Sequence, residues 1–266
     1  MIVENELLMD VVGDIAEVAG YLWQKGWAER NGGNISVNVT GCLTDGEIKA
    51  EPVRRNVPLE EGVPGLGGEA FYVTGTGKRM RYVALDPFDN GAIIRLSKAG
   101  DRFDILTERD IAPTSELSSH LLMHDFLRAE GRPSGVVLHT HPTVLTGLSH
   151  CKEYLKEGAM SRLLWSMIPE CVLVVPKGVG IVPYEMPGSL ALAHATINKL
   201  KEHDIVIWEK HGILSVGDNI IDCFDAIDTL DKAARIFLNA QATGHPAEGL
   251  TDRQVDELAT AFGVRR

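Results

Sequence analysis

Two histidines stand two positions apart at the end of an apolar run, in the stretch "GVVLHTHPTVL" (residues 135–145). The run predicts a β-strand, and side chains at positions i and i+2 of a strand project from the same face. His139 and His141 should therefore point together, while Thr140 points away. Two imidazoles placed in this way could both bind the same zinc ion, each nitrogen at roughly 2.0–2.1 Å from it. A His-x-His pair is not a metal site by itself, so a third ligand is needed.

A third histidine, His211, follows another apolar run in "IVIWEKHGIL" and precedes a glycine. It can be read either as a loop histidine or as a ligand that joins His139 and His141. Catalytic zinc is held by three protein ligands and keeps a fourth position open for water or substrate. The sequence therefore suggests a site formed by His139, His141 and His211, and an open metal site needs an acid or base nearby.

Glu116 is the candidate for that acid or base. Pro113, Thr114 and Ser115 in "APTSELSSH" are typical of a helix start, which places the Glu116 carboxylate in the first turn. An acidic residue in a first turn also complements the helix dipole without any catalytic role. Spacing alone leaves both interpretations open.

A second histidine pair competes with this metal site. His120 and His124 are four residues apart and share a helix face, as in a zinc-binding HExxH motif. Leu121 occupies the position where that motif requires its glutamate. We therefore interpret His120 and His124 as packing or surface residues.

Glycine-rich turns could bind an anionic part of a substrate. In "RNGGNIS", Asn31 and Asn34 flank a Gly-Gly pair that includes Gly33, and such a turn lets backbone amides approach an anion closely. The same turn could simply end a helix. A second turn, "VTGTGK", follows a predicted strand and adds the hydroxyl of Thr76.

A third anion-binding position is the predicted helix start itself. Thr114 and Ser115 place hydroxyls and amides at a helix N-terminus, where phosphate binds well. Three such positions beside a metal suggest a phosphorylated substrate. The GxxxxGK[ST] and GxGxxG patterns of nucleotide-binding loops are both absent from the sequence.

Alternating helical and strand patterns predict the elements that must position these residues. Apolar residues at three- and four-residue steps predict a first helix that ends near Gly26, and further helices are predicted over 115–130, 190–202, 220–241 and "DRQVDELATAFG". Strands are predicted at "ISVNV", "AFYVTG", "GAIIRL", "GVVLHTH", "CVLVVP", "DIVIW" and "ILSVG", with a surface insertion between the first two.

Several of these strands are joined by connections too short for a helical crossover, such as "EKHG". We therefore expect an α/β fold, a three-layer sandwich whose central, largely antiparallel β-sheet is flanked by helices. The length of 266 residues favours a single domain over 1–266.

The composition narrows the class of partner and the compartment. The net charge of −11 repels nucleic acids and anionic membranes, so we expect neither as a partner. The four cysteines are scattered and form no CxxC pair, as expected of reduced core residues. The start "MIVENELLMD" lacks the features of a secretory signal, which predicts a cytoplasmic protein.

Together, "NGGNIS", "VTGTGK", "PTSEL", "HTHP" and "EKHG", in this order, resemble the class II aldolase and adducin family. The resemblance runs from about residue 10 to residue 263. It is closest to members that cleave L-rhamnulose 1-phosphate, because of "KGWAERNGGN", "ECVLVVPKGVGIVPYEMPG" and the insertion between the first two strands.

This resemblance implies a cytoplasmic homotetramer that carries one Zn²⁺ per subunit and acts in L-rhamnose catabolism. The implied reaction is retro-aldol cleavage of L-rhamnulose 1-phosphate, a small phosphorylated ketose, to dihydroxyacetone phosphate and L-lactaldehyde. The implied roles are zinc ligands for the three histidines, acid/base catalysis for Glu116, and phosphate binding for the remaining candidates: Asn31, Gly33, Asn34, Thr76, Thr114 and Ser115. Thr76 replaces a commoner serine, which keeps the hydroxyl and adds a methyl group.

A second carboxylate, Glu170, precedes an apolar run in "MIPECVLVV". Its sequence context alone favours a solvated carboxylate at the entry of a buried strand. The resemblance implies instead that Glu170 is catalytic and reaches across a subunit interface to the oxygen at C4 of the sugar.

Other functions within the family remain open. Fuculose-phosphate aldolases and ribulose-phosphate 4-epimerases would share the metal and phosphate sites and differ where the far end of the sugar binds. An adducin-like interaction domain is expected to lack the metal histidines, whereas this chain has all three.

Overall fold

The computed structural model describes residues 5–264. Its centre is a sheet with the strand order β2-β5-β4-β3-β1-β6-β9-β8-β7, nine strands within the described range. These strands are β1 (Asn34–Asn38), β2 (Arg54–Pro58), β3 (Ala70–Thr74), β4 (Gly91–Leu96), β5 (Arg102–Ile105), β6 (Val136–Thr140), β7 (Val179–Val182), β8 (Ile205–Trp208) and β9 (Gly212–Gly217). Neighbouring strands pair antiparallel, except that β7 and β8 are parallel.

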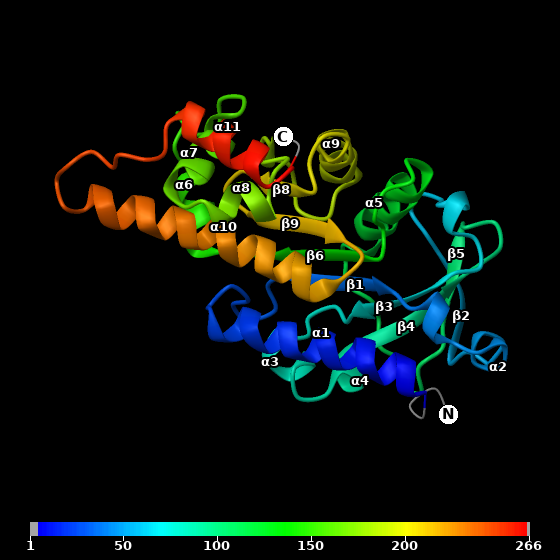
Figure 1. Cartoon of the computed structure of the whole chain (residues 1–266). Coiled ribbons are helices and arrows are strands. Elements are labelled where there is room, and N and C mark those ends of the chain that lie inside the picture. Colours follow the sequence, from blue (N-terminus) through cyan, green and yellow to red (C-terminus); the bar gives the residue numbers. More distant parts are fainter. Residues whose placement is uncertain (1–4, 265–266) are drawn as a thin grey trace.

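Helices cover both faces of this sheet (Figure 1). One face carries α1 (Glu6–Gln24), α3 (Met80–Val83), α4 (Pro87–Asn90), α6 (Thr143–Leu148), α7 (Ala159–Met167), α8 (Glu170–Val174) and α10 (Ile220–Gln241). The opposite face carries α5 (Leu117–Ala129) and α9 (Leu190–Leu200). The short α2 (Asp45–Ile48) precedes β2, and α11 (Asp252–Ala261) packs beside α7 and α8. The expected three-layer α/β sandwich is therefore confirmed.

Strand β6 shows how the sequence pattern builds the core. Val136 and Leu138 pack with α10 and α6 on one face, whereas Val137 packs with α5 and α9 on the other. A strand buried on both faces reads as a continuous apolar run, as "GVVL" does. The alternation continues at the end of the strand, where the Thr140 hydroxyl donates to the carbonyl of Trp27 on the α10 side. His139 takes the opposite direction, as its spacing predicted.

One predicted strand is wrong. The run "CVLVVP" contains α8, not a strand, and the nearby strand is β7, which the sequence patterns did not identify. Pro169 is the N-cap of α8, and Cys171 and Val172 are buried against the neighbouring helices. A five-residue apolar run has no periodicity that separates a buried strand from a buried helix turn.

The region before residue 70 is more than a surface insertion. It contributes β2, which pairs with β5 and forms one edge of the sheet. Neither strand was predicted, since β2 ("RRNVP") is polar and largely exposed and β5 has four residues.

All four cysteines are free. Cys171 and Cys223 are buried, but Cys151 is exposed and Cys42 is half-buried, so the expectation of four core cysteines is wrong for Cys151 and Cys42.

Across residues 5–264, no helix combines the length and the apolar character that a membrane crossing requires.

Candidate active site

The three candidate histidines meet where β6 ends beside the β8–β9 hairpin. His139 lies opposite Leu214 in the antiparallel pairing of β6 with β9. The hairpin loop turns sharply at Lys210, whose φ is 62°, and the His211 amide donates to the carbonyl of Trp208. The turn brings His211 next to His139 and His141, which are some seventy positions earlier in the chain.

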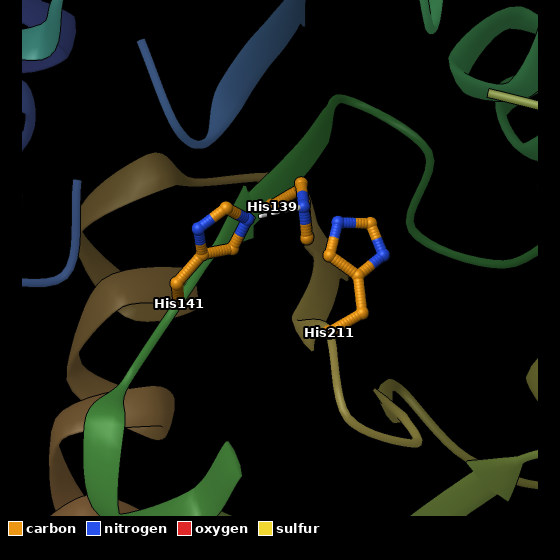
Figure 2. Close-up of side chains that lie close together, drawn as sticks. All are labelled: His139, His141 and His211. Atoms are coloured by element: carbon orange, nitrogen blue, oxygen red, sulfur yellow. Dashed lines mark hydrogen bonds between the residues drawn. The ribbon is translucent and has the colours of Figure 1, made fainter. Parts of the chain in front are cut away.

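The three imidazole rings form a compact cluster (Figure 2). The centroid of the His139 ring is 4.9 Å from those of His141 and His211, which are 5.3 Å from each other. The Nε2 atoms of His139 and His141 are 3.1 Å apart. One nitrogen from each ring lies within 4.8 Å of the others, so the three side chains could hold a metal ion.

Hydrogen bonds on the far side of two rings fix which nitrogen faces the cluster. Nδ1 of His139 donates to the carbonyl of Ile213 at 2.9 Å, and Nδ1 of His141 donates to Oε1 of Glu29 at 2.7 Å. With the proton on Nδ1, the Nε2 atom of each ring faces the shared space and can offer a lone pair to a metal ion. Nδ1 of His211 is buried and lacks a hydrogen-bond partner among the described residues.

Electrostatics keep these rings in the form that binds metals. Burial, followed by the neighbouring imidazoles, lowers the pKa of His139 well below its ordinary value. Burial likewise lowers the pKa of His211 to about 4. Both rings are therefore neutral near pH 7, as metal ligation requires. Three imidazoles, two of them with outer hydrogen-bond partners, are a donor set that suits zinc.

Two glycines permit the close approach of the segments around the cluster. A Cβ atom on Gly212 would lie 2.6 Å from the carbonyl oxygen of Thr140 and 2.8 Å from Cδ2 of His141. A Cβ atom on Gly33 would lie 2.8 Å from the carbonyl oxygen of His139, and its φ of +76° itself favours glycine. The glycine in "EKHG" and the second glycine in "NGGN" are therefore required by packing.

Glu116 lies at the N-cap of α5, one position before the helix, and its side chain makes no capping hydrogen bond. Instead, its Oε2 atom is 2.7 Å from Nδ2 of Asn34. Only 8% of Glu116 is exposed, and this burial raises the pKa of its carboxyl, an effect opposed by Asn34 and His141. Since the side chain makes no capping bond, its position does not support a purely capping role.

The histidine cluster and Glu116 line one cavity of about 380 Å³. The cavity also contains all the candidate phosphate-binding positions, which are Asn31, Gly33, Asn34, Thr76, Thr114 and Ser115. Backbone hydrogen bonds join the loop of Thr76 to the segment of Thr114 and Ser115. The Thr114 amide donates to the carbonyl of Thr74, and the Thr76 amide donates to the carbonyl of Ala112. Three segments far apart in the sequence thus form one wall.

Sequence patterns missed three residues of this cavity. Glu29 binds His141 from 112 residues away, a pairing that only the fold establishes. Arg30 and Lys78 also line the cavity and place two cations in an otherwise acidic protein. Both stand inside the quoted motifs "ERNGGN" and "TGTGK", so a basic residue next to a glycine-rich turn was the available signal.

Two sets of residues lie outside the histidine cluster. His120 and His124 are fully buried on α5 and hydrogen-bond Ser36, so they are not surface residues and do not belong to that cluster. Glu170 is exposed and lines a separate cavity of about 730 Å³. Among the described residues, none lines both cavities, so Glu170 does not reach the histidines of its own chain.

The chain is similar to proteins of known class. It is 43% identical over 264 residues to the rhamnulose-1-phosphate aldolase of Bacteroides thetaiotaomicron, covering 99% of this chain and 98% of that protein. It is 35% identical to the rhamnulose-1-phosphate aldolase of Enterococcus faecalis, covering 98% and 94%. The crystal structure of a sugar-phosphate aldolase from Thermotoga maritima superposes with a TM-score of 0.79 at 28% identity, covering 90% and 98%.

The match to a family extends over most of the fold. Residues 13–238 match the family described as "Class II Aldolase and Adducin N-terminal domain". That range includes β1 to β9, every histidine of the cluster and Glu116. The chain therefore belongs to the class II aldolase and adducin family.

Proposed function

We propose that this protein is a zinc-dependent aldehyde-lyase that cleaves L-rhamnulose 1-phosphate to dihydroxyacetone phosphate and L-lactaldehyde. The observation that carries the proposal is the single cavity in which three imidazoles, a buried carboxyl and glycine-rich loops meet. Similarity to rhamnulose-1-phosphate aldolases along nearly the whole chain supports the choice of sugar.

His139, His141 and His211 would hold the ion, because their nitrogens already surround one space and the outer hydrogen bonds of His139 and His141 are in place. Three protein ligands leave a coordination position for substrate. When bound, the ion supplies Lewis-acid stabilisation to the ketone oxygen and the neighbouring hydroxyl of the substrate. This role makes a lysine Schiff base unnecessary.

Glu116 acts as the acid for the fragment that becomes dihydroxyacetone phosphate. When the bond between C3 and C4 breaks, its electron pair remains on C3, and the Glu116 carboxyl gives its proton to that carbon. Burial raises the pKa of Glu116, which favours the acid form of its carboxyl. In the condensation direction the resulting carboxylate takes the proton back.

The substrate phosphate binds at the wall of the cavity that is lined by the two glycine-rich loops and the start of α5. The N-terminus of the thirteen-residue helix α5 favours negative charge there. Arg30 and Lys78 add positive charge to the same wall. An anionic substrate can therefore bind locally although the whole protein carries a charge of −11.

Glu170 completes the reaction from another subunit. Cleavage removes the proton of the C4 hydroxyl, and Glu116 is already committed to C3, so a second base must take it. Glu170 is exposed on a different cavity, which supports its use by a neighbouring copy. Trp23, Tyr82 and Leu85 are exposed on or near α1 and α3, as expected of a surface that another subunit covers.

The same proposal includes a cytoplasmic homotetramer in which each chain is one domain. One sheet takes its strands from residues 34–217, and both α1 and α10 pack on the same core. This arrangement supports one folding unit over the whole chain.

The test is an assay of dihydroxyacetone phosphate release with L-rhamnulose 1-phosphate, L-fuculose 1-phosphate and unphosphorylated L-rhamnulose. We expect the first to be cleaved with the highest kcat/KM, one zinc ion per chain by elemental analysis, and loss of activity on chelation without unfolding. Equal cleavage of the unphosphorylated sugar would contradict the phosphate site. A folded protein with neither zinc nor activity would indicate an adducin-like interaction domain.

A further inference from the structure

A chain of buried side chains leads from Glu116 away from the cavity into the layer between the sheet and α5. Asn34, at the start of β1, is its first member: Nδ2 lies 2.7 Å from Oε2 of Glu116, and Oδ1 lies 2.5 Å from Nε2 of His120. One amide thus connects the candidate acid to a histidine that does not belong to the metal cluster.

The chain continues from His120 through a serine to a second histidine. Nδ1 of His120 and Nε2 of His124 both lie 2.8 Å from Oγ of Ser36. Nδ1 of His124 lies 2.6 Å from the carbonyl oxygen of Ser134, and the series of hydrogen bonds ends there. Ser36, His120 and His124 are fully buried, so each of their hydrogen-bonding atoms depends on the neighbour along the chain.

The backbone end of this chain fixes its direction. A carbonyl oxygen only accepts, so Nδ1 of His124 carries a proton, and a neutral ring then accepts at Nε2. The single proton of the Ser36 hydroxyl must therefore point to His124. The Ser36 oxygen in turn accepts from Nδ1 of His120, which leaves Nε2 of a neutral His120 as an acceptor.

The direction of the chain then determines the orientation of Asn34. An accepting Nε2 on His120 requires the NH₂ group of Asn34 to face it, which turns the amide oxygen of Asn34 toward Glu116. The Glu116 carboxyl must in this case donate, that is, carry a proton. A half-turn of the amide exchanges its oxygen and nitrogen and leaves the other heavy atoms in place.

The orientation of the Asn34 amide in this structure instead matches an ionised Glu116. Nδ2 of Asn34 donates to an ionised Glu116, and Oδ1 accepts from Nε2 of His120. With neutral rings, the two nitrogens that face Ser36 are then both acceptors and compete for one hydroxyl proton. The ionised state therefore lacks one hydrogen bond in a buried region, unless a ring gains a proton.

We propose that Ser36, His120 and His124 are positioning residues that favour the acid form of Glu116, through the orientation of the Asn34 amide. The inference rests on the proposed function, in which Glu116 gives its proton to C3. Before cleavage, the carboxyl donates to Asn34 and the chain is complete. For the transfer, the carboxyl releases its hydrogen bond to Asn34 and gives this proton to C3. The amide of Asn34 then turns and donates to the resulting carboxylate.

The surroundings agree with this assignment. Burial lowers the pKa of His120 to about 3 and that of His124 to about 4, so both rings are neutral near pH 7. Burial also raises the pKa of Glu116. The charged and titratable side chains that line the same cavity as Glu116 are Glu29, Arg30, Lys78, His139, His141 and His211, and the charge of His141 lowers the pKa of Glu116.

The decisive measurement is the tautomer of His120 in the zinc-loaded protein near pH 7, by ¹⁵N NMR of histidine-labelled protein. His120→Gln and His124→Gln would assign the signals by their loss. We expect the proton on Nδ1 in both residues. A proton on Nε2 of a neutral His120, or a doubly protonated ring, would overturn the proposal whatever the activity. If the protein has the expected tautomers but cleaves no ketose phosphate, the proposed function is overturned, while the hydrogen-bond arrangement from His124 to Glu116 still holds.

Ser36→Ala tests the effect on the reaction. Without the hydroxyl, His120 is free to place its proton on Nε2 and to donate to Asn34, so Glu116 ionises more readily. We expect kcat for cleavage to fall by about tenfold, the effect of one hydrogen bond, with KM and zinc content unchanged and the His120 proton moved to Nε2. Ser215→Ala, which removes another buried serine hydroxyl from the sheet, is the control and should retain kcat. An unchanged tautomer with unchanged kcat in Ser36→Ala would contradict the proposal.

Discussion

The Nδ1 atom of His141 lies 2.7 Å from Oε1 of Glu29, a residue of the loop between α1 and β1. The carbonyl of Trp27, two residues before Glu29, accepts from the amide of His141 and from the hydroxyl of Thr140. These bonds attach the loop to the end of β6. The loop that contains the proposed phosphate-binding residues Asn31 and Gly33 therefore also orients a candidate metal ligand.

Removing the Glu29 carboxylate should weaken metal binding. Outer partners of a ligating histidine fix its ring and raise its basicity, and their loss typically costs about 10–100-fold in metal affinity. We expect that loss for Glu29→Ala and a smaller one for Glu29→Gln, whose amide oxygen still accepts. Competition with a chromophoric chelator would measure both, with Glu153→Ala on the exposed surface as the control. Wild-type affinity in Glu29→Ala would show that the ring needs no such partner.

Gly212→Ala should disrupt the metal cluster more than the fold. The added Cβ would lie 2.6 Å from a backbone oxygen and 2.8 and 3.0 Å from the rings of His141 and His139, so at least one ring must move. We expect zinc content to fall well below one ion per chain, while circular dichroism retains the native secondary structure. Gly147→Ala is the matched control, because nothing lies within 4 Å of its Cβ position. Full zinc content in Gly212→Ala would contradict the packing argument.

Buried histidines should make the protein less stable in acid. Burial lowers the pKa of His120 and His124 to about 3 and about 4 from the ordinary 6.5. Their contribution to stability is therefore fully present above about pH 6.5 and is lost as the pH falls toward those lower values. Each should add about 1.4 kcal/mol per pH unit to the slope of the unfolding free energy in this window.

Urea denaturation of metal-free protein between pH 6.5 and 4.5 would measure this slope. His124→Gln should reduce it by the share of one histidine, about 1.4 kcal/mol per pH unit. His245→Gln, which changes an exposed side chain, should retain the wild-type slope. A slope that is the same in His124→Gln and wild type would show that His124 binds its proton equally well in the folded protein.

The sequence predicted the parts of this site that lie within single elements. The spacing of His139 and His141 follows from strand geometry, and the glycine-rich turns are local features. The tertiary pairings were not predictable in this way, because Glu29 and His141 are 112 residues apart, and Asn34 and Glu116 are 82 apart. The sheet order, in which β1 lies between β3 and β6, brings these residues together, because the segment before Glu116 is hydrogen-bonded to the end of β3.

The errors in the fold have equally local causes. The run around Val172 has the same composition as a buried strand, and its helical state depends on Pro169 and on packing between α7, α10 and α11. The edge strand β2 has exposed, mostly polar residues, so no alternation marks it. The sequence could not show that the Glu116 side chain makes no capping bond and binds Asn34 instead.

Glu116→Gln should separate catalysis from binding. The substitution keeps the size of the side chain but cannot give up a carboxyl proton, so we expect kcat to fall by roughly 10²–10⁴ while zinc content and substrate affinity persist. Glu130→Gln, at the other end of α5, is the control and should retain kcat. Near-normal turnover in Glu116→Gln would reduce Glu116 to a residue that complements the helix N-terminus.

The position of Glu170 predicts that inactive subunits can complement one another. Its side chain lies on a cavity with Gln24, Asp228 and Arg235, away from the histidines of its own chain. If Glu170 serves the site of a neighbour, a Glu170→Ala subunit still offers an intact Glu116, and a Glu116→Ala subunit still offers an intact Glu170. Each variant alone should be inactive.

Mixing the two variants and exchanging their subunits should therefore restore part of the wild-type rate. Activity should appear at each interface that joins the intact Glu116 of one subunit to the intact Glu170 of the next. Native mass spectrometry would confirm the exchange, and a mixture of Glu116→Ala with Glu116→Gln is the control that should remain inactive. If hybrids form and dihydroxyacetone phosphate release does not recover, Glu170 does not act across the interface. In a shared site, dissociation of the wild-type oligomer should also abolish turnover while each chain retains its zinc, because all three imidazoles come from one chain.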